Sequence, residues 1–200
     1  MGRLRQGAVV DRWIRAKAAA STHLRVVGGE FGGRRLSAPR GIRPTQGLVR
    51  EAVFNILGPA VDEATVLDLF AGSGALGIEA LSRGAATTTF VDHDDASVRV
   101  IRRNLGALGL GQRARVVRWE VTRWLASHSD DVKAASLVLL DPPYNDALLL
   151  HALALLDTLV AGGTTVVAEH AHRQPLPSLD RLRARRLRRY GDTAVSFLEL

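Results

Sequence analysis

The sequence contains no cysteine, and this single absence excludes several chemistries. Without thiols the chain has no disulfide bridge, no cysteine-ligated zinc or iron–sulfur cluster and no thiol nucleophile. The sequence also lacks an apolar run of about 18 residues, the length that a membrane-spanning helix needs, and lacks an apolar signal core. We therefore expect a cytoplasmic protein with no membrane partner, and a monomer is the simplest expectation.

Lysine is scarce as well, since 25 arginines accompany only two lysines. The 200 residues, 46% hydrophobic and 24% charged, suit one globular domain with a small appendage. The net charge is +9 over residues 1–50, −6 over residues 51–172 and +4 over residues 173–200. A mildly acidic body with basic ends favours a nucleic-acid partner, although a compositional preference for arginine would give the same excess.

The order of the predicted elements indicates an α/β fold. Strands expected over 65–70, 87–91, 114–118, 136–140 and 164–168 are separated by helices that include 95–108 and 146–160. The runs 183–190 and 193–200, which flank Gly191-Asp192, predict a closing antiparallel hairpin. This pattern predicts a Rossmann-like, mostly parallel seven-stranded sheet with ligands at the carboxyl ends of its strands.

Three segments are expected along the chain. Residues 1–23 form a basic arm, either a short helix or disordered, and residues 24–44 form a small β-hairpin extension around Gly28–Gly33. Residues 45–200 form the main domain. Its first helix is expected to begin at Thr45, to end at Gly58-Pro59 and to bury one apolar stripe, which comprises Leu48, Ala52, Val53, Ile56 and Leu57.

A glycine-rich loop joins the first strand of this domain to the next helix. Gly72, Gly74 and Gly77 match G-x-G-x-x-G, in which glycine permits a tight turn and a close approach of the backbone to a ligand. Asp92 follows Gly72 by twenty residues, at the end of the second strand, where a carboxylate can accept hydrogen bonds from ribose hydroxyls. The motif alone fits a dinucleotide or S-adenosylmethionine, and a glycine turn without a ligand is the plainest alternative.

Two residues favour S-adenosylmethionine. Asp68 lies just before the glycines, where its carboxylate would attract the cationic amino group of a methionine moiety and would repel a pyrophosphate. Phe70 suits the same cofactor. Glu120 is placed for a polar contact with adenine, unless it is a solvated surface acid. The candidate cofactor-binding residues are Asp68, Phe70, Ala71, Gly72, Ser73, Gly74, Gly77, Asp92, His93, Glu120 and Val121.

A second motif, Asp141-Pro142-Pro143-Tyr144, ends the fourth predicted strand. Doubly wound topology brings the ends of strands one and four side by side, so these four candidate catalytic residues should face the reactive end of the cofactor. Asp141 and the Pro142 carbonyl can accept the two N–H groups of a planar amine, and Tyr144 can stack on a base. This set suits methylation of an exocyclic ring amine, without a metal; the plainest alternative is a rigid turn.

The chain resembles the bacterial 16S ribosomal RNA guanine-N2 methyltransferases over residues 25–200. The amine-methylating tetrapeptide is shared with other methyltransferases, whereas the N-terminal segments are more specific. The similar segments are Arg25–Gly29, Gly33–Leu36, Arg43–Thr45, Val49–Glu51, Phe54–Leu57, Asp68–Gly77, Glu79–Ala85 and Asp141–Tyr144. One departure is Gly47-Leu48, where the family usually has Asp-Arg.

The resemblance implies a class I methyltransferase fold and S-adenosylmethionine as the cofactor, bound by Asp68–Gly74 and Asp92. It implies that Asp141–Tyr144 hold a flipped guanine of 16S ribosomal RNA, in the small ribosomal subunit or an assembly intermediate. It also implies that Asn55 lies near the cofactor or supports the scaffold, and that the hairpin contacts RNA. The arginines expected on phosphates are Arg25, Arg34, Arg35, Arg40 and Arg43.

Three other functions fit part of the pattern. A DNA amine methyltransferase would share the chemistry but needs a target-reading insertion for which 200 residues leave no room. A nicotinamide-dependent oxidoreductase would use the glycine loop but leaves Asp141–Tyr144 unexplained and lacks a Tyr-x-x-x-Lys pair. A non-catalytic RNA-binding module would explain the basic ends but would not need both motifs.

Overall fold

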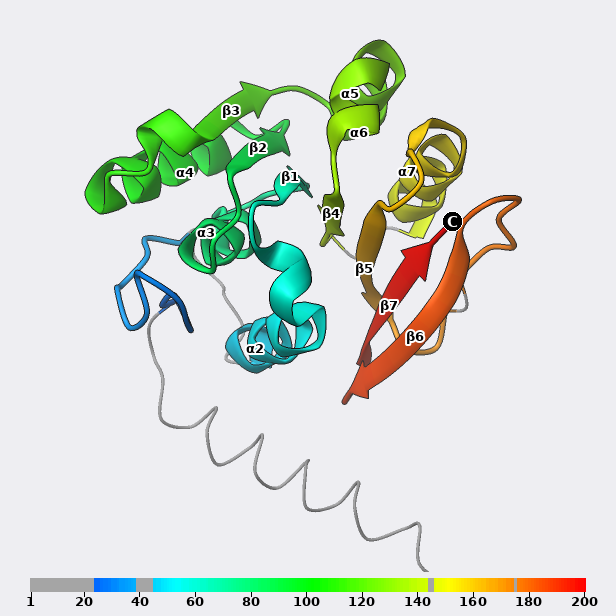
Figure 1. Cartoon of the computed structure of the whole chain (residues 1–200), viewed down its shortest axis with the longest axis horizontal. Helices are drawn as coiled ribbons and strands as arrows, with labels where there is room; N and C mark the ends of the chain where they lie inside the picture. Colours follow the sequence, from blue (N-terminus) through cyan, green and yellow to red (C-terminus); the bar gives the residue numbers. More distant parts are fainter. Residues whose placement is uncertain (1–23, 39–44, 144–145, 175) are drawn as a thin grey trace, which may run out of the picture.

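The computed structural model describes residues 24–38, 45–143, 146–174 and 176–200. They form an α/β structure around one seven-stranded sheet, in the order β3-β2-β1-β4-β5-β7-β6 (Figure 1). The strands are β1 (Thr65–Leu69), β2 (Thr87–Asp92), β3 (Ala114–Arg118), β4 (Leu137–Leu140), β5 (Thr165–Ala171), β6 (Arg183–Tyr190) and β7 (Thr193–Glu199). The first five are mutually parallel, and β7 is antiparallel to both β5 and β6. The predicted fold is confirmed, including its closing hairpin.

Helices cover both faces of the sheet. One face carries α2 (Thr45–Leu57), α3 (Ala75–Ser82) and α4 (Asp95–Leu108), and the other carries α5 (Val121–Ser127), α6 (Ser129–Ala134) and α7 (Asp146–Leu159). Two short 3-10 helices, Gly58–Val61 and Gly111–Arg113, complete the elements. Because the central strand β4 is covered on both sides, its residues Leu137–Leu140 are all buried, as a continuous apolar run predicts.

The buried face of α2 differs from the predicted stripe. The structure buries Val49, Val53, Phe54 and Leu57. Leu48, Ala52 and Ile56 are only partly buried. Both sets have helical spacing, and the packing of α2 against β1, β4, β5 and β7 selects the face that includes the large Phe54 ring. The helix ends at Leu57, directly before Gly58-Pro59 as predicted, and the chain then continues as the 3-10 helix Gly58–Val61.

The segment that precedes α2 folds back on itself as expected, but with less regular structure. Arg25 and Arg35 form an isolated antiparallel bridge, supported by bonds from the Val26 amide to the Arg34 carbonyl and from the Leu36 amide to the Leu24 carbonyl, each 2.9 Å long. Val26 and Leu36 are buried against α3 and α4, so the segment is part of the core. The predicted arm over 1–23 and the end of the expected extension, 39–44, lie outside the described residues. No helix in the described ranges is long and apolar enough to cross a membrane.

Candidate active site

The two sequence motifs lie at the same edge of the sheet. Strands β1 and β4 are parallel neighbours whose last paired residues are Leu69 and Leu140. The residues that follow these two strands, Phe70 and Asp141, therefore both lie at the carboxyl ends of the parallel strands. The convergence of the two loops, on which the predicted chemistry depends, is present.

The loop after β1 has an unusual backbone that begins before its first glycine. Phe70, Gly72 and Gly74 all have positive φ angles, of 60°, 54° and 75°. A positive φ is rare for a bulky residue such as Phe70, so the surrounding structure must hold the turn in place. The Ala71 amide donates to the Val91 carbonyl at 3.2 Å, and Gly74 immediately precedes α3. The tight turn brings the beginning of α3 to the carboxyl end of β1.

The third glycine of the motif serves packing. A Cβ atom on Gly77 would lie 2.4 Å from Cε1 of Phe90 and 2.8 Å from Cγ2 of Thr88. Only glycine therefore allows α3 to approach β2 this closely. The Gly77 amide also donates to the carboxylate of Asp68 at 2.8 Å. This position thus fixes the helix relative to both β1 and β2.

Asp68 is an almost completely buried acid, with 1% of its surface exposed. Burial raises the pKa of its carboxyl group well above the ordinary value, the hydrogen bond from Gly77 opposes this, and the neighbouring acids Asp141 and Asp92 raise the pKa further. A cationic ligand at this edge would relieve the repulsion among the three acids. Within the described residues, no group of three His, Cys, Asp or Glu side chains is arranged to hold a metal ion.

Asp92 ties the glycine loop to the end of β2. One carboxylate oxygen accepts the Gly72 amide at 2.7 Å, and the other accepts the Asp94 amide at 2.8 Å. Each oxygen keeps a further lone pair with which it can accept a ligand hydroxyl. His93, beside it, is exposed, and its Nδ1 lies 3.6 Å from Asp92.

Glu120 has a structural role that sequence reasoning missed, because it caps α5. Its carboxylate accepts the amides of Thr122 and Arg123, at 3.0 and 2.9 Å, and the Thr122 hydroxyl at 2.8 Å. Burial acts to raise the pKa of Glu120, but these hydrogen bonds outweigh it and the pKa is lowered. Val121 is buried in the core behind this cap. An adenine contact by this pair stays a prediction.

The remaining predicted site residues are placed as follows. Asp141 and Pro142 are partly buried and Pro143 is exposed, at the end of β4. Asn55 is exposed on α2. Arg25, Arg34 and Arg35 are exposed on residues 24–38, the N-terminal segment, as an RNA-contacting role requires. Tyr144, Arg40 and Arg43 lie outside the residues that the structure describes.

Comparisons with known proteins agree with this geometry. The sequence profile of the family described as Conserved hypothetical protein 95 matches residues 24–199. Ribosomal RNA small subunit methyltransferase D of Escherichia coli K12 is 41% identical over 141 residues, which cover 70% of this chain and 69% of that protein. The chain belongs to this ribosomal RNA methyltransferase family.

Solved structures show the same fold. A hypothetical protein of Thermus thermophilus superposes with a TM-score of 0.76 and 32% identity, over 88% of this chain and 99% of that chain. An RNA methyltransferase of Salinibacter ruber, solved in complex with S-adenosyl-L-homocysteine, superposes with a TM-score of 0.59 at 18% identity. That match covers 81% of this chain and 92% of the other, and it shows a shared fold.

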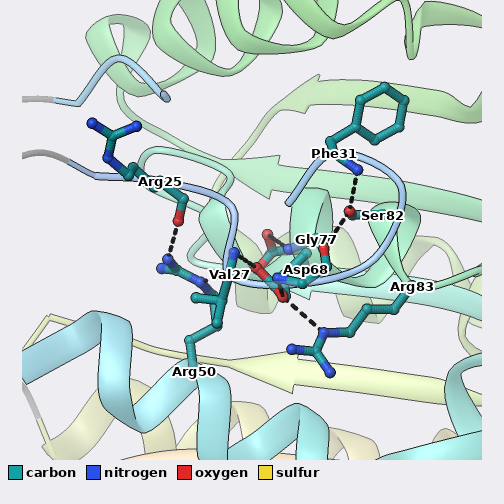
Figure 2. A network of polar contacts seen from close by, with 10 residues as sticks. Arg25, Val27, Phe31, Arg50, Asp68, Gly77, Ser82 and Arg83 are labelled. Carbon is teal, nitrogen blue, oxygen red and sulfur yellow. Dashed lines mark hydrogen bonds and ion pairs between the residues drawn. The ribbon is translucent and has the colours of Figure 1, made fainter. Parts of the chain in front are cut away.

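In this member of the methyltransferase D family, the N-terminal segment is docked on α3 by a buried acid. Glu79, fully buried, accepts the Val27 and Gly28 amides at 2.7 and 2.8 Å (Figure 2). The same carboxylate pairs with Arg83, at 2.7 Å, and with Arg50 of α2, at 3.5 Å. Glu79 lies two residues after Gly77, the partner of Asp68. One short helix therefore connects the N-terminal segment to the glycine loop.

Two contacts of Ser82 strengthen this attachment. The Ser82 hydroxyl donates to the Gly28 carbonyl at 2.6 Å and accepts the Phe31 amide at 2.9 Å (Figure 2). A Cβ atom on Gly29, where φ is 73°, would lie only 1.9 Å from the Ser82 carbonyl oxygen. The segments Val49–Glu51 and Glu79–Ala85 thus hold Arg25–Gly29 in place. This contact gives a physical reason why all three segments resemble the family.

Asn104 was not predicted as a site residue, yet it joins both parts of the site. Its side chain, 2% exposed on α4, exchanges hydrogen bonds with the backbone of Ser37, at 2.8 and 2.9 Å. The same amide donates to the Ser73 carbonyl of the glycine loop at 3.0 Å. The sequence signal was a polar residue on the largely apolar buried face of an amphipathic helix.

Proposed function

We propose that this protein is an S-adenosylmethionine-dependent methyltransferase that modifies the exocyclic N2 amine of a guanine in 16S ribosomal RNA of the small subunit. Family membership supports methylation of ribosomal RNA. The main support for the amine chemistry is the register of β1 and β4. Because Leu69 lies opposite Leu140, the glycine loop and Asp141-Pro142 begin at the same end of the sheet.

The residues at this edge fit the cofactor. Bound S-adenosylmethionine supplies an electrophilic methyl group on a sulfonium centre. Asp68, buried next to two other acids, offers the negative charge that the cationic methionine end requires. Asp92 supplies carboxylate oxygens for ribose hydroxyls, and the loop Phe70–Gly74 lets the backbone approach closely. His93, Glu120, Val121 and Asn55 are proposed at the periphery of the same site.

The acceptors after β4 match a planar amine. The carboxylate of Asp141 accepts one N–H of the guanine amine, and the Pro142 carbonyl oxygen accepts the other. These bonds direct the nitrogen lone pair, which is otherwise delocalised into the ring, toward the methyl group. The Asp141 charge would also stabilise the positive charge that develops on nitrogen as the new N–C bond forms and the methyl–sulfur bond breaks, before the nitrogen loses one proton to solvent. Pro143 stiffens the turn, and Tyr144 is proposed to stack on the flipped base.

The RNA is proposed to be held through its phosphates. Arg25, Arg34 and Arg35 are exposed on a segment that Glu79 and Asn104 attach to the cofactor side of the molecule. Arg40 and Arg43 are proposed to extend the same surface. The partner is the small ribosomal subunit or an assembly intermediate, met in the cytoplasm by a monomeric enzyme.

A methyl-transfer assay tests the proposal. Tritiated S-adenosylmethionine is incubated with the full chain and with small ribosomal subunits, free 16S RNA or duplex DNA. We expect label in the RNA substrates, and N2-methylguanosine by mass spectrometry after nuclease digestion. Label on DNA alone, or on another nucleoside, would contradict the assignment. A melting shift with S-adenosylhomocysteine but not with NAD tests the cofactor separately.

A further inference from the structure

The edge strand β6 carries an excess of positive charge. Its sequence, Arg-Ala-Arg-Arg-Leu-Arg-Arg-Tyr, holds five arginines and no acid, and Arg183–Arg189 are all exposed. We name Arg183–Tyr190 the basic edge strand. Leu187, in its middle, is 55% exposed, and β7 is the neighbouring strand with which β6 pairs in the sheet.

The direction of the strand brings its end to the edge that carries the site. Because β7 is antiparallel to both β5 and β6, β6 runs in the same direction as β4 and β5. Arg188 and Arg189 therefore lie toward the carboxyl ends of the parallel strands, where Asp141 follows β4. The Asp192 carbonyl, in the turn after β6, accepts the His172 amide at 2.8 Å, which fixes this turn beside the end of β5.

The five arginines do not have equal freedom to bind a ligand. Arg183 donates to the Leu179 and Asp180 carbonyls, and Arg185 lies 3.9 Å from Glu199. In contrast, none of Arg186, Arg188 and Arg189 forms an ion pair with an acidic side chain of the described residues. Arg188 and Arg189 donate only to nearby carbonyls, those of Leu187 and Gly191.

Two of these arginines share one face. In the β6–β7 register Arg186 is opposite Phe197 and Arg188 is opposite Val195. Residues directly opposite in an antiparallel pair lie on the same face, so both arginines project from the face on which α2 packs. The N-terminal segment packs on this same face, on the β2 side of the sheet, whereas β6 forms the other margin (Figure 1).

Protection of an exposed edge does not account for this composition. A single inward charge, a proline or a bulge is enough to discourage pairing between edges, and this strand already has a bulge between Ala184 and Arg186. Successive arginines repel one another, and this repulsion disfavours the folded strand unless anions lie nearby. A chain of phosphates has the spacing and sign to relieve it.

We infer that the basic edge strand, through Arg186, Arg188 and Arg189, binds backbone phosphates of the RNA that the enzyme methylates. The RNA then contacts basic surfaces at both margins of the site, this strand on one side and Arg25, Arg34 and Arg35 on the other. The inference rests on the proposed function and adds to it a second RNA-contacting element.

The test compares two double variants of the full chain that each lose two positive charges. Arg186→Gln/Arg188→Gln neutralises the basic edge strand. Arg115→Gln/Lys133→Gln removes one positive charge from β3 and one from α6, on the opposite margin. Both residues already pair with acids there. Binding to purified small subunits and to a 16S RNA transcript is measured over a series of salt concentrations. Melting temperature and S-adenosylhomocysteine affinity are measured alongside.

We expect the edge-strand variant to bind RNA roughly tenfold more weakly, with a salt-dependence slope smaller by about 2, as for two lost phosphate contacts. Its melting temperature and S-adenosylhomocysteine affinity should match the wild type, and the control should bind RNA within about twofold of it. An edge-strand variant that binds RNA as tightly as the control variant does would overturn the inference. The inference would also be overturned if the wild type forms a dimer that the edge-strand variant cannot form, while the two proteins bind RNA equally well. If the wild type methylates small subunits in that case, the proposed function stands.

Discussion

Asn104 donates its side-chain amide to the Ser73 carbonyl at 3.0 Å while holding the backbone of Ser37 through two further bonds. The glycine loop and the segment proposed to contact RNA therefore share one buried amide. Neither contact belongs to regular secondary structure, so this side chain, together with the contacts made by α3, aligns the two backbones. Changes at this position should affect cofactor and RNA together.

We predict that Asn104→Ala weakens both binding steps. The variant leaves partly buried backbone groups of Ser37 and Ser73 without their partner, which costs about 1–3 kcal/mol of stability. We expect S-adenosylhomocysteine affinity to fall roughly tenfold, the equivalent of about 1.4 kcal/mol, with a parallel rise in KM for RNA. Calorimetry and initial rates measure these effects. A variant that loses stability but retains both constants would reduce Asn104 to a scaffold residue.

Asp141→Asn should separate chemistry from cofactor binding. The amide keeps the size of the side chain but removes the charge that stabilises the reacting amine, so we expect turnover to fall roughly 100- to 1000-fold. S-adenosylhomocysteine affinity should remain within about threefold. Single-turnover methyl transfer and isothermal titration measure the two quantities. Full turnover in this variant would refute the proposed role of Asp141.

Asp68 gives the ligand-free protein a specific dependence of stability on pH. Because burial raises the folded-state pKa above its ordinary value of 3.8, the folded state holds a proton that the unfolded chain releases. The contribution to stability is fully present below the unfolded-state pKa and is lost as the pH rises toward the folded-state pKa. Asp68→Asn should remove this loss and raise the melting temperature at neutral pH, while abolishing detectable cofactor binding. Melting curves from pH 4 upward, compared with the wild type, test the sign.

Glu79→Ala should detach the N-terminal segment. It leaves Arg50, which is 4% exposed, without its buried partner and frees two backbone amides, so we expect a loss of about 3–5 kcal/mol. Asp95→Ala, which breaks the exposed pair with Arg99, is the control and should cost less than about 1 kcal/mol. Urea unfolding measures both. Equal losses in the two variants would contradict the assigned role of Glu79.

Local patterns predicted most of the fold, because the strands alternate with strongly amphipathic helices. The helix over residues 95–108 and the strand over residues 114–118 match α4 and β3 residue for residue. The strands expected around residues 25 and 35 shortened to one bridge, since that segment bonds mainly to α3 and α4 rather than to itself. Helices α5 and α6 were missed because each is shorter than two full turns.

Site residues could be predicted from the sequence where a motif determines the local backbone conformation. They could not be predicted where contacts between distant segments determine the position of the side chain. The glycines and Asp141 lie where their spacing indicates. The sequence predicts that Glu120 is either a ligand contact or a surface acid, and only the structure shows that its oxygens also accept the amides that begin α5. Asn104 bonds to two segments that are distant in sequence, so the local pattern could show a polar residue on a buried helix face but not the groups that it binds.

The raised pKa of Asp68 also has a consequence for calorimetry. A cationic ligand beside this carboxyl group lowers its pKa again, so binding at a pH near the raised value releases protons. The released proton is taken up by the buffer, so the heat of S-adenosylmethionine association should vary linearly with the ionisation enthalpy of the buffer, with a slope equal to the number of protons exchanged. A titration repeated in phosphate and in Tris would thus report directly on one side chain.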